Sequence, residues 1–193
     1  TAFTAMSLRE FGSFEKGMNE VFTLLPNMSE ESLGAMSQDV LDLAKELGVL
    51  PEELVPALYD SLSAGVPPGN VMEFLEVSVK GAKAGVASTG EAVDALSSAV
   101  NAYGSDALSA SKASDIMFTT IRLGKTTFPE LSAALYNVTP AAAAAGVSFE
   151  DVGASIAALT AQGVPTKVAT TQIRQAILSM MAPNKAMSDS FAA

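Results

Sequence analysis

Apolar residues recur at helical spacing along almost the whole chain, and this periodicity is the feature that most limits its fold. Near the N-terminus, Phe11, Phe14, Met18 and Val21 follow one another at intervals of three or four residues. Residues at this spacing lie on one face of an α-helix, so the pattern predicts amphipathic helices. Alternating runs rich in Val, Ile, Thr and aromatic residues, which indicate strands, are nearly absent. The sequence therefore predicts an all-α fold.

Glycine, proline and capping residues divide the periodic stretches into about ten short-to-medium helices. The expected helices are 3–25, 29–48, 51–64, 71–84, 89–104, 107–123, 127–138, 139–146, 148–163 and 166–181. The expected N-caps include Ser29, Thr89, Thr127 and Ser148. Pro56 is expected to kink its helix or delay the start of that helix. Short connections make successive helices antiparallel neighbours, so we expect helix-turn-helix units.

One stretch of sequence occurs twice, at a constant offset of 98 residues. Residues 48–67 and 146–165 align without a gap, and both open on Gly-Val and close on Gly-Val-Pro. A looser copy starts at Gly85. Each of the two main copies has an acidic pair where a helix is expected to begin; the pairs are Glu52-Glu53 and Glu150-Asp151. Two interpretations are open: the repeated frame builds a binding site, or it marks the ends of a repeated packing unit.

The composition excludes several kinds of chemistry. The chain has 193 residues with no Cys, His or Trp, so disulfides, Cys/His zinc sites and Ser-His-Asp or Cys-His nucleophiles are excluded. The formal net charge of −10 argues against direct nucleic-acid binding by this segment. No apolar run is long enough to predict a membrane span, and no signal-peptide pattern is present. Because the chain starts without Met, we expect it to be part of a longer protein.

Three motifs point to chemistry, and each has a structural alternative. "TTIRLGKTT" (119–127) resembles a phosphate-binding loop, but Thr119 stands where the pattern requires glycine, so we interpret Gly124 as a helix C-cap. Ser109 and Lys112 match Ser-x-x-Lys without its Lys-Thr-Gly partner, which favours a polar helix surface. The acidic pairs, Glu30-Glu31 among them, fit first turns of helices. We therefore assign no catalytic, cofactor-binding or metal-binding residue and expect no enzyme.

The second half resembles the core region of phage tail tape measure proteins of the TP901 type, from about residue 85 to residue 183. The matching residues are Lys112 and Asp115; Thr127, Glu130 and Leu131; Gly146-Val147; Ala157-Ala158-Leu159; Gly163-Val164; and Ala169-Thr170 with Arg174. Thr171-Gln172 departs from the family, where a small residue is common. None of these residues is catalytic in the family, so the resemblance carries no active site to this chain.

The resemblance implies a structural virion protein of the tail, in the tube lumen or at the tip, and in the host cytoplasm during assembly. Such proteins template tube polymerisation, set tail length and leave ahead of the DNA. The implied partners are further copies of the chain, as a trimer, together with tail-tube and tail-tip or baseplate hub proteins. The alternative is a membrane-interacting helical segment that aids genome delivery, because the mean hydropathy is positive and Met and Phe line stripes such as Phe3–Leu25. The expected segments are an N-terminal amphipathic helix (1–26), a first helical unit (27–84), a tape-measure-like core (85–183) and the start of a following segment (184–193).

Overall fold

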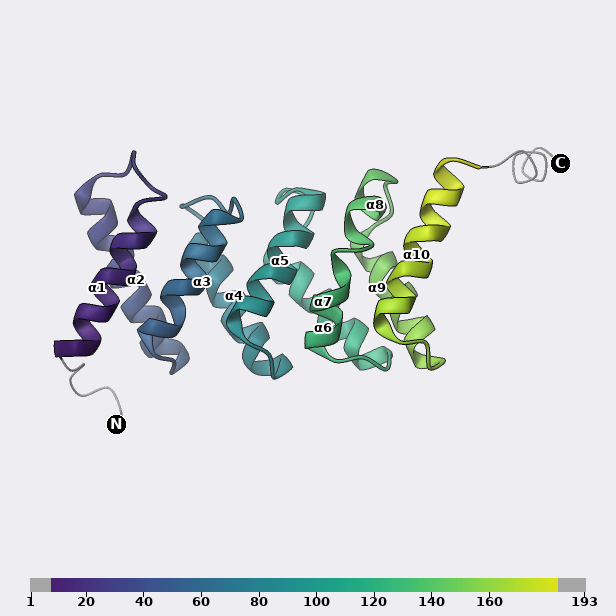
Figure 1. Ribbon diagram of the computed structural model, residues 1–193, viewed down its shortest axis with the longest axis horizontal. Helices are drawn as coiled ribbons and strands as arrows, with labels where there is room; N and C mark the ends of the chain where they lie inside the picture. Colours follow the sequence, from purple (N-terminus) through teal and green to yellow (C-terminus); the bar gives the residue numbers. More distant parts are fainter. Residues whose placement is uncertain (1–7, 184–193) are drawn as a thin grey trace. The chain divides into compact units, whose positions relative to one another are not determined.

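A computed structural model describes residues 8–183, and the only regular elements in that range are ten α-helices. These are α1 (Leu8–Phe22), α2 (Glu30–Leu47), α3 (Pro51–Ser63), α4 (Val71–Gly85), α5 (Thr89–Tyr103), α6 (Ala110–Leu123), α7 (Phe128–Leu135), α8 (Thr139–Ala144), α9 (Phe149–Ala161) and α10 (Thr166–Met181). The all-α prediction is confirmed (Figure 1). The expected residues 1–7 of the N-terminal helix and the expected segment 184–193 lie outside the described residues.

The chain forms two compact units, residues 1–97 and residues 98–193, and the division falls within α5. In the first unit α1 and α4 both pack on α3, and α2 packs on both α3 and α4. In the second unit α6 packs on α9, and α10 packs on α7, α8 and α9. The predicted segments 27–84 and 85–183 remain predictions.

Serine and threonine hydroxyls begin several helices, as the sequence predicts. Ser29, Thr127 and Ser148 each accept a hydrogen bond from the backbone N–H three residues later. Ser109 caps α6 in the same way, although it was not predicted as a cap from the sequence. The prediction that Thr89 caps α5 is off by one residue, because the Ser88 hydroxyl accepts from the Glu91 N–H instead. The Glu91 carboxylate accepts from the N–H and the hydroxyl of Ser88, and these bonds lower the pKa of Glu91.

Several helix bounds differ from the expectations: α1 ends at Phe22 and not at residue 25, and α6 begins at Ala110 and not at residue 107. The helix α3 begins at Pro51, as expected, so Pro56 inside it does not delay its start. The helix expected at 127–138 ends at Leu135, and α8 begins only at Thr139. The chain therefore interrupts this region directly before Pro140, which cannot donate a backbone hydrogen bond.

A left-handed residue followed by one characteristic hydrogen bond ends five of the helices. Gly48, Gly65, Gly146 and Gly163 have φ values between 63° and 92°. In each case the next residue donates its N–H to the carbonyl five positions earlier, as in Val49 to Ala44 and Val147 to Ala142. The looser copy uses the same ending with a shift of one residue: Val86, not Gly85, has φ 53°, and Ala87 donates to Ala82.

The repeat extends well beyond the 20 positions visible in the sequence. Both ends of α9 lie 98 residues after the corresponding ends of α3, and four positions counted from the helix start are buried in both helices. These pairs are Pro51/Phe149, Leu54/Val152, Val55/Gly153 and Leu58/Ile156. The start of α7 lies 98 residues after the start of α2, and α8 ends at Ala144, one residue short of the position that corresponds to the end of α2. Corresponding helices therefore follow in the same order in the two units, and the counterpart of α2 is divided into α7 and α8.

Close helix approach occurs at equivalent positions of α3 and α9, with α1 and α6 as the respective partner helices. A Cβ at Gly17 on α1 would lie 2.7 Å from Val55 Cγ1 on α3. A Cβ at Gly153 on α9, the counterpart of Val55, would lie 2.6 Å from Thr120 Oγ1 on α6. Each pair therefore joins one glycine to one β-branched residue, with the two roles exchanged between the helices. This complementarity lets both helix pairs pack closely.

Candidate functional site

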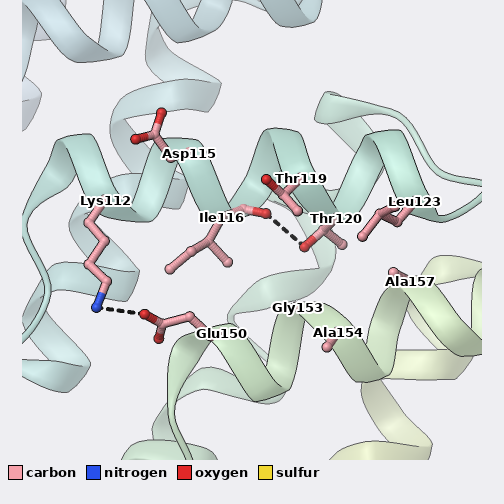
Figure 2. A pocket seen from close by; sticks show the side chains of 10 residues that line it. All are labelled: Lys112, Asp115, Ile116, Thr119, Thr120, Leu123, Glu150, Gly153, Ala154 and Ala157. Carbon is pink, nitrogen blue, oxygen red and sulfur yellow. Dashed lines mark hydrogen bonds and ion pairs between the residues drawn. The ribbon is translucent and has the colours of Figure 1, made fainter.

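The groove between α6 and α9 is the place where the sequence-derived candidates meet. It has a volume of about 290 Å³, and Figure 2 shows its lining from both helices. The lining residues are Lys112, Asp115, Ile116, Thr119, Thr120 and Leu123 of α6, with Glu150, Gly153, Ala154 and Ala157 of α9. Most of these side chains are apolar or hold their polar atom close to the backbone; the Thr120 hydroxyl donates to the Ile116 carbonyl at 2.8 Å.

The charged end of the groove is an ion pair. Lys112 Nζ lies 2.6 Å from Glu150 Oε1, and both side chains are about half exposed. The hydrogen bond from Lys112 lowers the pKa of the Glu150 carboxyl. The Lys112 ammonium therefore lies beside a carboxylate, and Ser109 accepts a hydrogen bond from the Lys112 N–H as a helix cap. This arrangement gives Ser109 no activating base, so the Ser-x-x-Lys match has a structural explanation.

Glu150 and Asp151, the acidic pair at the start of α9, make different contacts. The Asp151 carboxylate accepts a hydrogen bond from the Ser148 hydroxyl at 2.7 Å, and the Asp151 backbone N–H donates to the Ser148 hydroxyl oxygen at 3.1 Å. The pair Ser148 and Asp151 thus forms a reciprocal cap at the start of α9. Glu150 reaches across to α6 instead. The two carboxylates therefore have separate partners.

The first unit has a groove at the corresponding position, between α1 and α3. Its volume is about 320 Å³, and its lining includes Glu52, Val55, Pro56 and Tyr59, the counterparts of Glu150, Gly153, Ala154 and Ala157. Among the described side chains, Glu52 forms no ion pair. The groove is therefore repeated, but the ion pair is not. This difference favours the interpretation that the repeat marks a packing unit over the interpretation that it builds a binding site.

The stretch 119–127 lies at a helix crossing. Gly124 is extended, with φ −101° and ψ −172°, and a Cβ there would lie 2.5 Å from Thr160 Oγ1 and 2.9 Å from Ala157 Cα. The next residue, Lys125, donates its N–H to Thr160 Oγ1 at 3.1 Å. Gly124 does follow the C-terminus of α6, as interpreted from the sequence. Its absent side chain serves close packing against α9.

A family model described as "Phage-related minor tail protein" matches residues 37–193. The chain belongs to this family. It is 35% identical over 146 residues to a probable tape measure protein of Clostridium phage phiCD119, an alignment covering 74% of this chain and 15% of that protein. It is 24% identical over 185 residues to the tape measure protein of Pneumococcus phage Dp-1, covering 96% of this chain and 16% of that protein. No solved structure matches.

These findings confirm the resemblance to phage tail tape measure proteins. The family is one of structural proteins of the phage tail, so this minor tail protein segment is a component of the virion tail. The chain spans about one sixth of the length of the curated relatives it matches.

The described part of this minor tail protein offers few groups for other chemistry. Residues 8–183 hold no group of three or more Asp and Glu residues arranged to bind a metal ion, and within the same range no helix has the length and apolarity to cross a membrane. The N-terminal stripe that suggested membrane contact is largely buried: Phe14, Met18, Val21 and Leu25 are at most 7% exposed. Phe11, at 45%, is its exposed member, and Phe3 and Met6 lie outside the described residues.

Sequence reasoning missed the tyrosine that joins α5 to the start of α9 in this tail protein. The Tyr103 hydroxyl donates to the Val147 carbonyl at 2.9 Å, and its ring meets Phe149 edge-on with centroids 5.8 Å apart. Burial, with smaller contributions from Glu150 and Asp151, raises the pKa of Tyr103 to about 12. Tyr103 therefore stays neutral and donates. No local pattern predicts this contact, because its partners are 44 residues apart.

Proposed function

We propose that this chain is a packing module of a tape measure protein that templates tail-tube polymerisation, sets tail length and leaves ahead of the DNA during ejection. The single observation that carries the proposal is the similarity to two phage proteins named as tape measure proteins, together with the family match over residues 37–193. The proposed place is the tail-tube lumen or tail tip, with assembly in the host cytoplasm.

The geometry supports an assembly role rather than catalysis. In the second unit Lys112 and Glu150 pair with each other, the Thr120 hydroxyl bonds to the backbone of its own helix, and Ser148 with Asp151 caps α9. The groove between α1 and α3 lies at the position equivalent to the groove between α6 and α9, and among the described side chains its acidic residue Glu52 lacks the ion pair that Glu150 makes. We therefore propose a non-enzymatic role. The absence of wall-degrading activity from the purified chain on a zymogram, beside an active lysozyme lane, would agree with it, and a cleared band would contradict it.

The proposed partners are further copies of the same protein, as a trimer, and the tail-tube and tail-tip or baseplate hub proteins. The net charge of −10 supports a role without direct nucleic-acid contact. Membrane contact during ejection has less support, because most described members of the N-terminal apolar stripe are buried. Flotation of the chain with liposomes of neutral and anionic lipid tests it, and association with either would restore that alternative.

Tail length in the intact phage tests the main proposal. Two in-frame deletions of different length, placed in the tape measure protein outside residues 1–193, should shorten the tail in proportion to the residues removed. Tail length is measured on electron micrographs of assembled particles. Full-length tails from both deletion phages would refute the length-setting role. Deletions of the same lengths in an unrelated tail gene should not produce a graded series of shorter tails.

A further inference from the structure

A third groove, between α9 and α10, has a volume of about 520 Å³ and is lined mainly by apolar side chains. On α10 these include Ile173, Ala176, Ile177 and Met180, at positions i, i+3, i+4 and i+7. That spacing describes one continuous apolar face of a helix. Met180 is 59% exposed, so part of this face is open in residues 8–183. On α9 the lining includes Val152, Ser155, Ala158 and Leu159.

The first unit contains the counterpart of this face, and there it is buried. The α10 residues that line the groove lie 98 positions after Phe74, Leu75, Ser78, Val79 and Ala82 of α4. All five of these α4 residues are at most 4% exposed. Of their α10 counterparts only Ile177 is buried, while Gln172, Ala176 and Met180 are exposed. The same helix face is therefore covered on α4 in the first unit and open on α10 in the second unit.

The order of helices indicates what a cover would be. After α4 the chain turns through residues 86–88 and enters α5, so α5 begins next to the end of α4. In the part of α5 that belongs to the first unit, Ala92, Val93, Ala95 and Leu96 are each at most 2% exposed. These side chains form the inward face of an amphipathic helix of mostly small residues. In the second unit, α10 is the last helix described, and the curated relatives are about six times longer than the matched segment.

We propose that the groove between α9 and α10 receives a helix of the same polypeptide that follows this segment and acts as the counterpart of α5. The occupant is amphipathic, with small and medium apolar residues at helical spacing and an outward polar face. It follows α10 in the chain as α5 follows α4, and it buries the open face of α10. This inference does not depend on the tail-length role.

Thiol accessibility tests the proposal directly, because the chain has no cysteine of its own. Ala176→Cys places a thiol in the groove at an exposed position, and Gln175→Cys places one on an exposed neighbour that does not line the groove. Each variant is made in the intact tail protein and in the chain of residues 1–193. The labelling rate with a maleimide is read on the peptide that contains the new cysteine, and circular dichroism checks that the helices are retained.

In the intact protein we expect the thiol at position 176 to react about tenfold or more slowly than in the chain of residues 1–193. The control thiol at position 175 should react at the same rate in both. Equal rates at position 176 in the two proteins would overturn the proposal. Concentration-dependent protection of position 176 already in the chain of residues 1–193 would also overturn it, because the occupant would then be a second copy.

Discussion

Replacing Val86 by glycine should stabilise the first unit, although it removes a side chain. Val86 ends α4 in the left-handed conformation, with φ 53° and ψ 50°, and it is the only non-glycine residue with positive φ among residues 8–183. A β-branched side chain in this conformation crowds its own backbone. Gly48 and Gly146 hold the equivalent position after the ends of α2 and α8.

The magnitude follows from two opposing effects. Relief of the left-handed conformation contributes about 1–2 kcal/mol, and the greater freedom of glycine in the unfolded chain costs about 0.5–1 kcal/mol. Val86 is 88% exposed, so its removal loses almost no buried apolar contact. The net expectation is a gain of about 0.5–1 kcal/mol in the free energy of unfolding.

Urea unfolding followed by circular dichroism measures this difference. The midpoints of the variant and the parent are compared on the condition that the slope of the unfolding free energy against urea concentration is the same for both. Val86→Ala is the matched control: it removes the exposed apolar atoms but keeps a Cβ in the left-handed conformation. It should recover much less stability than Val86→Gly. A destabilised glycine variant, or an alanine variant that gains as much as the glycine variant, would refute the reasoning.

Three further substitutions follow from the same geometry and are measured in the same unfolding assay. Gly163→Val should destabilise the second unit by about 1–3 kcal/mol, because φ is 92° there; no loss would contradict the strain. Gly124→Ala should cost about 1–3 kcal/mol, because its Cβ would meet Thr160; an unchanged midpoint would contradict the close approach. Glu150→Gln should change stability by less than about 0.5 kcal/mol at neutral pH, because its pairing with Lys112 is solvent-exposed. The lowered pKa of Glu150 means that this small contribution is present above its unfolded pKa and is lost as the pH falls through the folded pKa, so the variant and the parent should converge in acid.

Capping residues and first-turn carboxylates account for most of what was predicted correctly from the sequence. Ser29, Thr127 and Ser148 each precede an acidic residue in a first turn, and each caps a helix. At the start of α5 two hydroxyl residues stand side by side, and either can cap. The carboxylate of Glu91 decides between them by reaching back to Ser88, three residues before it, rather than to Thr89.

Contacts between distant residues account for what the sequence did not predict. Lys112 and Glu150 each stand in the first turn of a different helix, and only the packing of α6 on α9 brings them together. The left-handed conformation of Val86 was not predicted, because local sterics favour glycine in that conformation. The repeat was visible only around α3 and α9, since the interruption between α7 and α8 hides the correspondence with α2.

Tail assembly by a double variant tests the central claim, that the repeated stretch is a packing frame and not a binding site. The intact tail protein carries Glu52→Gln with Glu150→Gln, and assembled tails are counted and measured by electron microscopy. Gly65→Val with Gly163→Val is the matched comparison, and it should greatly reduce the number of tails. We expect the glutamine variant to assemble tails of normal number and length. Loss of tails by that variant, with unchanged helix content and unfolding midpoint, would contradict the account and show that the acidic positions form a site.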